Sequence, residues 1–179
     1  MIEKIICCGF GGQGIMVMGK FLSNLAIEAD KFTTYLPAYG AEVRGGTAHC
    51  MVIISDEEIC APFVSVADTA IIMNEPSLSK FENRIAPGGL LLLNESLISS
   101  LPRRKDIEVL KVPFSDIAVK LGNIRCANTV ALGTYLSSKN IAPKEKIDLV
   151  MDKMLGGLKQ EVIEINRKAL REGMKYDKS

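Results

Sequence analysis

One stretch near the start of the chain decides its fold class: Ile5-Ile6-Cys7-Cys8-Gly9-Phe10-Gly11-Gly12-Gln13-Gly14. Its apolar run is short and uninterrupted, which is typical of a strand covered on both faces. Four of the six residues from position 9 to position 14 are glycine, so the backbone can take positive φ and approach a ligand or another segment closely. A helix that starts here presents free N–H groups and a partial positive charge, which suits an anion. The stretch predicts a strand, a tight loop and a helix.

The residues after this loop have a helical period. Apolar side chains recur at steps of three and four residues, at Ile15, Met18, Leu22, Leu25, Ala26 and Ala29. The segment from Phe32 to Leu36 is rich in aromatic and β-branched residues and predicts a second strand. Together these elements predict a right-handed βαβ unit.

The rest of the chain alternates apolar runs with short helical patterns. Strands are predicted over 47–55, 68–74, 90–94 and 107–112, and helices over 76–85, 115–121, 125–137, 143–155 and 158–173. We expect residues 59–61 to return antiparallel to the strand 47–55 as a hairpin. The elements predict one domain over residues 1–179, a three-layer α/β/α fold with a mostly parallel sheet, an antiparallel hairpin and a Rossmann-like start.

Three local features add detail. Ala86-Pro87-Gly88-Gly89 is expected to form a turn, and Ser115 to be the N-cap of the helix 115–121. In the helix 125–137 the small residues Ala127, Ala131 and Gly133 would let a neighbour pack closely, and Asn128 is interpreted as a buried polar anchor.

Composition narrows the function classes. The chain has 22 Lys and Arg against 21 Asp and Glu, so its formal net charge of +1 would not recruit nucleic acid or an anionic membrane. No run of about 18 uncharged apolar residues is present, and the first residues lack a basic region leading into a cleavable apolar core. We therefore expect a cytoplasmic protein.

The cysteines give no sign of a metal site. Cys7, Cys8, Cys50, Cys60 and Cys126 form an odd set without a C-x-x-C spacing, and four of the five lie in or beside apolar runs. We expect buried, reduced thiols in that set. The single histidine, His49, lies within a predicted strand and is interpreted as a packing residue. We predict neither a metal site nor a catalytic residue in this chain.

The glycine-rich loop allows one alternative. Gly9, Gly11 and Gly14 match the spacing of a dinucleotide-binding loop. NAD recognition also requires an acidic residue at the end of the second strand, which binds the ribose hydroxyls. That position carries Tyr35-Leu36-Pro37, with Asp30 too early and Glu42 too late. A stand-alone nucleotide-binding oxidoreductase is therefore the alternative to the function below.

A second glycine-containing loop follows the second strand. It reads Pro37-Ala38-Tyr39-Gly40-Ala41-Glu42-Val43-Arg44-Gly45-Gly46 and has no apolar period. One interpretation is a surface loop with an internal contact between Glu42 and Arg44. The other is a loop that holds the Arg44 guanidinium, which pairs bidentately with carboxylate or phosphate, at a ligand pocket or subunit interface.

The order of these motifs resembles a known family. The glycine-rich turn at 9–14, the segment 39–47, Pro87-Gly88-Gly89, and Gly122-Asn123 with Ala127-Asn128 are similar to the gamma subunit of 2-oxoacid:ferredoxin oxidoreductases over nearly the whole chain. The free-standing chain most resembles the 2-oxoglutarate type, while the pyruvate and branched-chain (2-oxoisovalerate) types share the motifs. One departure is Ala41, where the family commonly has proline.

The resemblance implies a role within a complex. Such complexes oxidatively decarboxylate a 2-oxoacid with coenzyme A and ferredoxin, giving acyl-CoA, CO2 and reduced ferredoxin. Thiamine diphosphate with magnesium belongs to the alpha and beta subunits, and iron–sulfur clusters to the beta or a ferredoxin-like delta subunit. The gamma chain would bind no cofactor alone and would be inactive in isolation.

The predicted site consists of the two glycine-containing loops at the carboxyl edge of the sheet. There they would contact partner subunits or coenzyme A. The residues we expect to take part are Gly11, Gly12, Gln13, Gly14, Tyr39, Arg44, Gly45 and Gly46.

Overall fold

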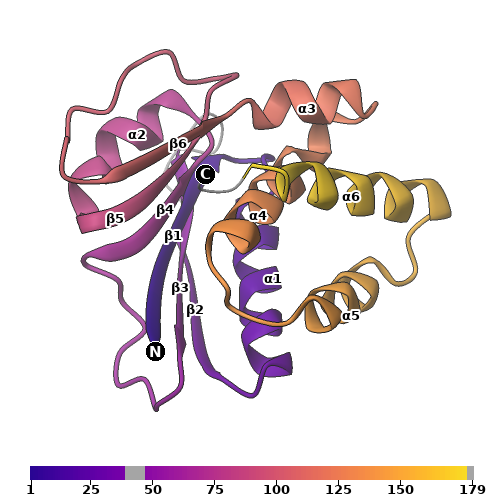
Figure 1. Ribbon diagram of the computed structural model, residues 1–179, viewed down its shortest axis with the longest axis horizontal. Helices are drawn as coiled ribbons and strands as arrows, with labels where there is room; N and C mark the ends of the chain where they lie inside the picture. Colours follow the sequence, from indigo (N-terminus) through magenta and orange to yellow (C-terminus); the bar gives the residue numbers. More distant parts are fainter. Residues whose placement is uncertain (39–46, 177–179) are drawn as a thin grey trace.

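The computed structural model describes residues 1–38 and 47–176, which form a mixed six-stranded sheet with helices packed against both faces (Figure 1). The strands are β1 (Ile2–Phe10), β2 (Phe32–Ala38), β3 (Thr47–Ser55), β4 (Ala67–Ile72), β5 (Ile85–Asn94) and β6 (Glu108–Val112). The helices are α1 (Ile15–Glu28), α2 (Glu75–Phe81), α3 (Phe114–Lys120), α4 (Ala127–Ser138), α5 (Lys144–Leu155) and α6 (Gln160–Gly173), with 3₁₀ turns η1 (Glu82–Arg84) and η2 (Ile124–Cys126). The α/β class predicted from the sequence is confirmed.

The sheet has a parallel half and an antiparallel half that meet at β1. Its strand order is β2-β3-β1-β4-β5-β6. The neighbours β1 and β4, β4 and β5, and β5 and β6 run parallel, whereas β3 is antiparallel to both β1 and β2. The predicted β1–α1–β2 unit is therefore split, because β3 lies between its two parallel strands.

The prediction that residues 59–61 pair with β3 as a hairpin is wrong. Residues 59–61 lie in an irregular loop, and β3 instead pairs with β2 on one side and with β1 on the other. Because a strand has two hydrogen-bonding edges and both are occupied, residues 59–61 have no edge left to join. The antiparallel partners of β3 come from earlier in the chain, which a local turn signal cannot show.

Two local predictions also need correction. The segment 86–89 does not leave the sheet as a turn but lies within β5, where the register with β4 shifts between Ala67 and Thr69. Ser115 is not an N-cap, because α3 starts one residue earlier, at Phe114, after the N-cap Pro113. The Ser115 backbone N–H donates to the side chain of Asn94 at 3.3 Å, so a tertiary contact takes the place of the expected cap.

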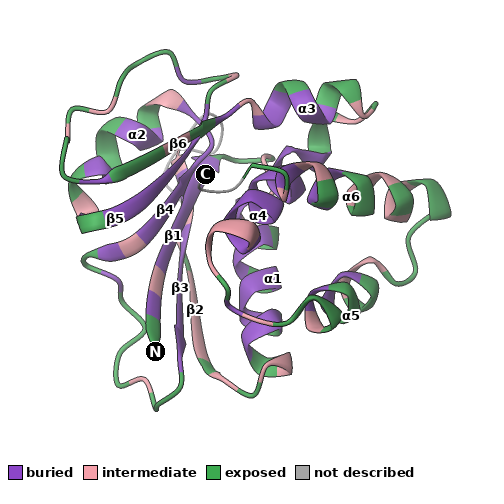
Figure 2. Ribbon diagram, viewed as in Figure 1, coloured by how far each residue is buried: buried purple, intermediate pink, exposed green. Residues whose placement is uncertain are grey.

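Alternation along β1 divides the interior into two apolar cores. Ile5 and Cys7 face α1, α3, α4, α5 and α6, whereas Ile6 and Cys8 face α2 and the loops beside it. Figure 2 shows the central strands buried almost throughout, with exposed residues on the connecting loops and on the outer helices. The three-layer arrangement follows from these two buried faces.

The small residues of α4 allow the close approach predicted for them. A Cβ atom on Gly133 would lie 2.1 Å from the Leu170 carbonyl oxygen of α6, and one on Gly173 would lie 2.0 Å from the Val130 carbonyl oxygen of α4. Thr134 Oγ1 also donates to the Gly173 carbonyl at 3.0 Å. The two helices are therefore in backbone contact, which no larger residue at these positions would permit.

The prediction that the cysteines are buried is confirmed for four of the five. Cys7, Cys8, Cys50 and Cys126 are buried, Cys60 is exposed, and all five are free thiols. Within the part of the chain that the structure describes, no helix has the length and apolar character needed to span a membrane.

Candidate functional site

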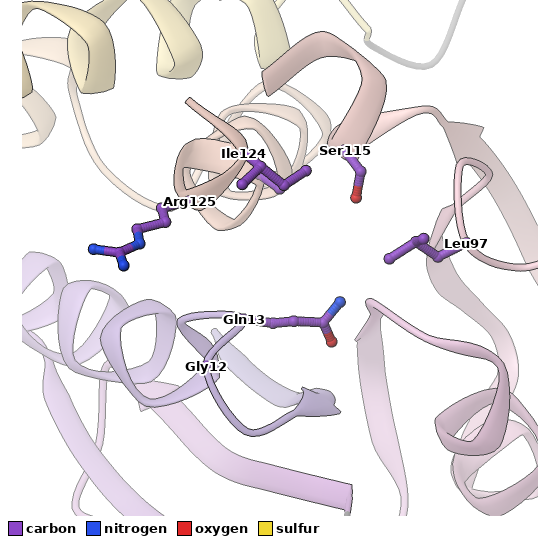
Figure 3. Close-up of a pocket in the computed structure, with 7 residues that line it drawn as sticks. Gly12, Gln13, Leu97, Ser115, Ile124 and Arg125 are labelled. Carbon is purple, nitrogen blue, oxygen red and sulfur yellow. The ribbon is translucent and has the colours of Figure 1, made fainter. Parts of the chain in front are cut away.

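The glycine-rich loop lies beside a cavity at the carboxyl edge of the parallel strands (Figure 3). The cavity has a volume of about 230 Å³, and its walls come from four places in the chain: the β1–α1 loop, the segment after β5, the first turn of α3, and η2 with the start of α4. Its lining residues are Gly12, Gln13, Leu97, Ser115, Ile124, Arg125 and Ala127. Ligands of open α/β sheets commonly bind at this edge.

The Gln13 side chain forms two hydrogen bonds that hold the glycine-rich loop closed, and this pair of bonds is called the Gln13 clasp. Its Oε1 accepts from the Phe10 N–H at 2.6 Å, and its Nε2 donates to the Met73 carbonyl, directly after β4, at 3.4 Å. A Cβ atom on Gly9 would lie 2.6 Å from Gln13 Oε1, so glycine at position 9 lets the amide fold over the strand end. The amide therefore joins the end of β1 to the end of β4 while also lining the cavity.

The helix after the loop begins without a side-chain cap. Its N-cap is Gly14, with φ of 74°, and its first turn contains no acidic residue. Asn128 of α4 is packed against this turn, and its Nδ2 donates to the Gly14 carbonyl at 3.4 Å. The interpretation of Asn128 as a buried polar anchor is confirmed, and what it anchors is the start of α1.

The cavity walls combine apolar side chains with one cation. Leu97 and Ile124 are 48 % and 52 % exposed, which is high for large apolar residues. Figure 3 shows both reaching into the space above Gln13, with Arg125 at the opposite end of the cavity from Leu97. None of the described lining residues is acidic. Such walls suit a ligand or partner segment that carries an anionic group on an apolar body.

Sequence reasoning missed most of these wall residues. Leu97, Ile124 and Arg125 come from irregular segments or a single 3₁₀ turn, so no periodic pattern marked them. Asn94 did carry a signal, because it is the polar residue that ends the apolar run of β5. The structure places its buried amide between the Met73 carbonyl and Ser115, at the base of the same edge.

For the second predicted loop, the structure describes only the strand ends that flank it. Tyr39, Arg44, Gly45 and Gly46 lie outside the described residues. Ala38 pairs with His49, and Thr47 pairs with Phe10 at the end of β1. The strand ends that flank this loop therefore lie next to the glycine-rich loop.

His49 lies on the α2 side of the same edge and is packed against aromatic and basic groups. Its ring centroid is 4.9 Å from that of Phe81, and its Nδ1 is buried with no hydrogen-bond partner among the residues that the structure describes. Burial lowers the pKa of His49, and the charges of Lys80 and Arg84 lower it further. The ring is therefore mainly neutral at pH 7, as a packed histidine should be.

Two arrangements needed for other chemistries are missing from the described residues. No group of three His, Cys, Asp or Glu side chains there could hold a metal ion. The end of β2 is separated from β1 by β3, whereas the ribose of a dinucleotide would need an acidic residue on a strand adjacent to β1. Asp30 lies in the α1–β2 turn, at the opposite end of the sheet.

The comparison with known families gives one clear match. Residues 4–176 match the family model described as pyruvate ferredoxin/flavodoxin oxidoreductase. The ketoisovalerate oxidoreductase subunit VorA of Methanothermobacter thermautotrophicus is 34% identical over 97% of this chain, but the match covers 36% of VorA. The chain thus spans about a third of the length of this curated relative. The 2-oxoglutarate synthase subunit KorC of Methanocaldococcus jannaschii is also 34% identical, over 90% of this chain and 88% of KorC.

Solved structures share the fold. The gamma subunit of a keto/oxoacid ferredoxin oxidoreductase from Geobacter sulfurreducens matches with a TM-score of 0.83 and 27% identity, over 97% of both chains. The 2-oxoglutarate:ferredoxin oxidoreductase of Magnetococcus marinus, solved with 2-oxoglutarate, coenzyme A and succinyl-CoA bound, matches with a TM-score of 0.89 and 23% identity, over 98% of this chain and 31% of that one. The chain belongs to the pyruvate ferredoxin/flavodoxin oxidoreductase family and is of the gamma-subunit type found in 2-oxoacid:ferredoxin oxidoreductases.

Proposed function

We propose that this chain is the gamma subunit of a complex that oxidatively decarboxylates 2-oxoglutarate with coenzyme A and ferredoxin, giving acyl-CoA, CO2 and reduced ferredoxin. The choice of 2-oxoglutarate as substrate rests on how much of each relative's length is matched, as well as on sequence identity. KorC and VorA are equally identical to this chain, but only KorC is matched over nearly its own full length. Pyruvate and 2-oxoisovalerate are the competing substrates.

The proposal assigns the redox chemistry to partner chains. Alpha and beta subunits would hold thiamine diphosphate and magnesium, and iron–sulfur clusters would lie in the beta or a ferredoxin-like delta subunit, from which ferredoxin takes the electrons. The buried free thiols of this chain agree with a reducing, cytoplasmic setting. Its own contribution would be a shaped surface that meets the catalytic subunits.

The observation that carries this assignment is the cavity beside the clasped glycine-rich loop. There a pocket, an uncapped helix start and exposed apolar side chains meet at the carboxyl edge of the parallel strands. We infer that Gly11, Gly12, Gln13 and Gly14 form one half of a contact to coenzyme A or to a partner subunit. Tyr39, Arg44, Gly45 and Gly46 would form the other half, since Thr47 pairs with Phe10 next to the first loop.

The substrate is tested on the native complex. Purification from the source cell should co-elute this chain with proteins that carry thiamine diphosphate and iron–sulfur clusters. With coenzyme A and an artificial electron acceptor, turnover should be fastest on 2-oxoglutarate. Faster turnover on pyruvate or 2-oxoisovalerate would contradict the substrate, and a chain that purifies alone would contradict the complex.

The loops are tested by Gln13→Ala and Arg44→Ala in the assembled complex. Each should raise the KM for coenzyme A, or weaken assembly, by about tenfold, which corresponds to about 1.4 kcal/mol. The control is Lys20→Ala, an exposed position on α1 away from the cavity walls, which should change neither quantity. Unchanged kinetics and unchanged assembly in both loop variants would contradict this site.

The alternative of a stand-alone nucleotide-binding oxidoreductase has one observation in its favour, the partial G-x-G-x-x-G spacing. Calorimetry on the purified chain with NAD, NADP, FAD and coenzyme A separates the two proposals. Micromolar binding of a dinucleotide would favour the alternative, and its absence is the result we expect.

A further inference from the structure

Asn94 is a fully buried polar residue at the carboxyl end of β5. Its Nδ2 donates to the Met73 carbonyl at 3.2 Å and to Ser115 Oγ at 2.9 Å, and its Oδ1 accepts from the Ser115 N–H at 3.3 Å. Both amide hydrogens and the amide oxygen are thus used. Replacing this last residue of β5 by an apolar one would remove the Asn94 partner of the Ser115 N–H and Oγ in the interior and would leave the Met73 carbonyl with its bond from Gln13 alone.

The Met73 carbonyl joins Asn94 to the glycine-rich loop. It accepts from Asn94 Nδ2 and also from Gln13 Nε2, at 3.4 Å, while the Met73 N–H donates to the Cys8 carbonyl of β1 at 2.9 Å. A carbonyl oxygen has two lone pairs, so it can accept both bonds at once. Through this one atom, the side chain that clasps the loop and the side chain that holds α3 are connected.

The two ends of this connection are facing walls of the cavity. Gln13 and Ser115 both line it, and Figure 3 shows them on different sides of the space. Asn94 itself is not one of the described lining residues; its hydrogen bonds reach the Met73 carbonyl, which also binds Gln13, and Ser115. A buried amide with three fixed bonds is well suited to set the separation of those walls.

We propose that Asn94 is a positioning residue of the site: through the Met73 carbonyl it holds the Gln13 clasp, and through Ser115 it holds the opposite wall, so that the glycine-rich loop keeps its binding shape. This inference rests on the proposed function for its kinetic readout. It differs from that function in assigning a role to a residue that touches no ligand.

The test is Asn94→Asp, which keeps the size of the side chain but replaces the NH2 donor by oxygen. The new oxygen faces the Met73 carbonyl, and its repulsion should loosen the Gln13 clasp. In the assembled complex we expect the KM for coenzyme A to rise about tenfold, with kcat changed less than about twofold. Ser115→Ala, which removes only one of the three partners, should raise KM about threefold.

A double-mutant cycle shows whether Asn94 acts through Gln13. With Gln13→Ala already present, adding Asn94→Asp should change KM by less than about twofold, because the clasp is already gone. Equal effects in both backgrounds would overturn the proposal, as would an unchanged KM in Asn94→Asp. The control is Thr134→Val, which removes a buried hydrogen bond between α4 and α6 and should lower the melting temperature without changing KM.

A second readout needs no activity. Amide hydrogen exchange of Phe10, whose N–H donates to Gln13 Oε1, can be followed by NMR on the purified chain. It should be at least about tenfold faster in Asn94→Asp than in wild type and unchanged in Thr134→Val. If the wild-type complex shows no coenzyme A-dependent oxidation of a 2-oxoacid, the proposed function fails, while the exchange rate of Phe10 still decides the role of Asn94.

Discussion

Two regions of this molecule depend on glycine, and they do so in different ways. In the α4–α6 contact, a Cβ on Gly133 or Gly173 would meet a backbone carbonyl oxygen at 2.1 or 2.0 Å. In the β1–α1 loop, a Cβ on Gly9 or Gly14 would meet the side-chain amides of Gln13 or Asn128, and one on Gly11 or Gly12 would meet no described atom within 4 Å. The first set faces fixed backbone, and the second faces adjustable side chains or open space.

The difference separates a structural use of glycine from a use at a site. A backbone carbonyl inside a helix cannot move without breaking the helix, so the α4–α6 glycines fix how the last helix covers the core. Among residues 1–38 and 47–176, nothing packs against the position of a Cβ on Gly11 or Gly12. Such open space is what a loop requires if a ligand or a partner backbone is to come close.

The largest effect is expected for Gly133→Ala. Helix propensity alone would favour alanine by about 1 kcal/mol. The clash with the Leu170 carbonyl should outweigh this and lower the free energy of unfolding by about 3 kcal/mol. Urea unfolding followed by circular dichroism measures it, with Ser138→Ala on the same helix as the control. A variant as stable as wild type would show that α6 can shift and that the contact is not rigid.

A smaller loss of stability, with a change in binding, is expected for Gly12→Ala. Gly12 has a φ of 91°, which costs a residue with a side chain about 1–2 kcal/mol, and the new methyl group would project from a loop that lines the cavity. Gly11→Ala is the matched control for stability, because Gly11 has no positive φ and a Cβ there would meet no described atom within 4 Å. Urea unfolding should show a loss of stability at position 12 and not at position 11, whereas the KM for coenzyme A should rise in both variants, since both residues belong to the proposed contact; equal stability of the two variants would contradict a cost of the positive φ.

The smallest effect is expected at the amino end of the sheet, far from both regions. The hydrogen bond from the Met1 ammonium, at 2.5 Å, and that from Lys31, at 2.9 Å, lower the pKa of Asp56 to about 2. A depressed folded pKa adds stability above the unfolded value of about 3.9, and this contribution is lost as the pH falls through about 2.

Asp56→Asn should therefore lower the melting temperature slightly at pH 7 and not at all below about pH 2. The ion pair is exposed, so the shift should be no more than about 2 °C and should shrink in high salt. Calorimetric scans at several pH values check this. A fall in melting temperature of much more than about 2 °C at pH 7 would mean that this ion pair contributes more to stability than an exposed pair is expected to.

Much of the fold could be predicted from short-range patterns. The apolar runs of β1, β4 and β5 and the helical period of α1 are local, and each predicted an element of the correct type, although β5 starts at Ile85, five residues before the predicted strand 90–94. The strand pairing was not local. The partner expected for β3 was the next segment along the chain, but two earlier strands occupy its edges. A pattern that repeats every two residues reports burial and does not report which strand lies alongside.

The site shows the same division. The glycines and Gln13 stood out because their residue types are unusual at that spacing, and the structure places Gly12 and Gln13 in the cavity wall. The other predicted loop lies outside the described residues. Leu97, Ser115 and Arg125 join the wall only because the end of β5, the start of α3 and η2 converge on one edge of the sheet.

Local sequence patterns are enough to predict an α/β chain with a glycine-rich turn after its first strand, since hydrophobic period and glycine content act within a few residues of one another. Three further features come from tertiary contacts: β3 lies between β1 and β2, the Gln13 amide closes its loop on Met73, and Asn94 holds the opposite wall. These are contacts between segments far apart in the chain. They depend on how the whole sheet is paired, which no local pattern encodes.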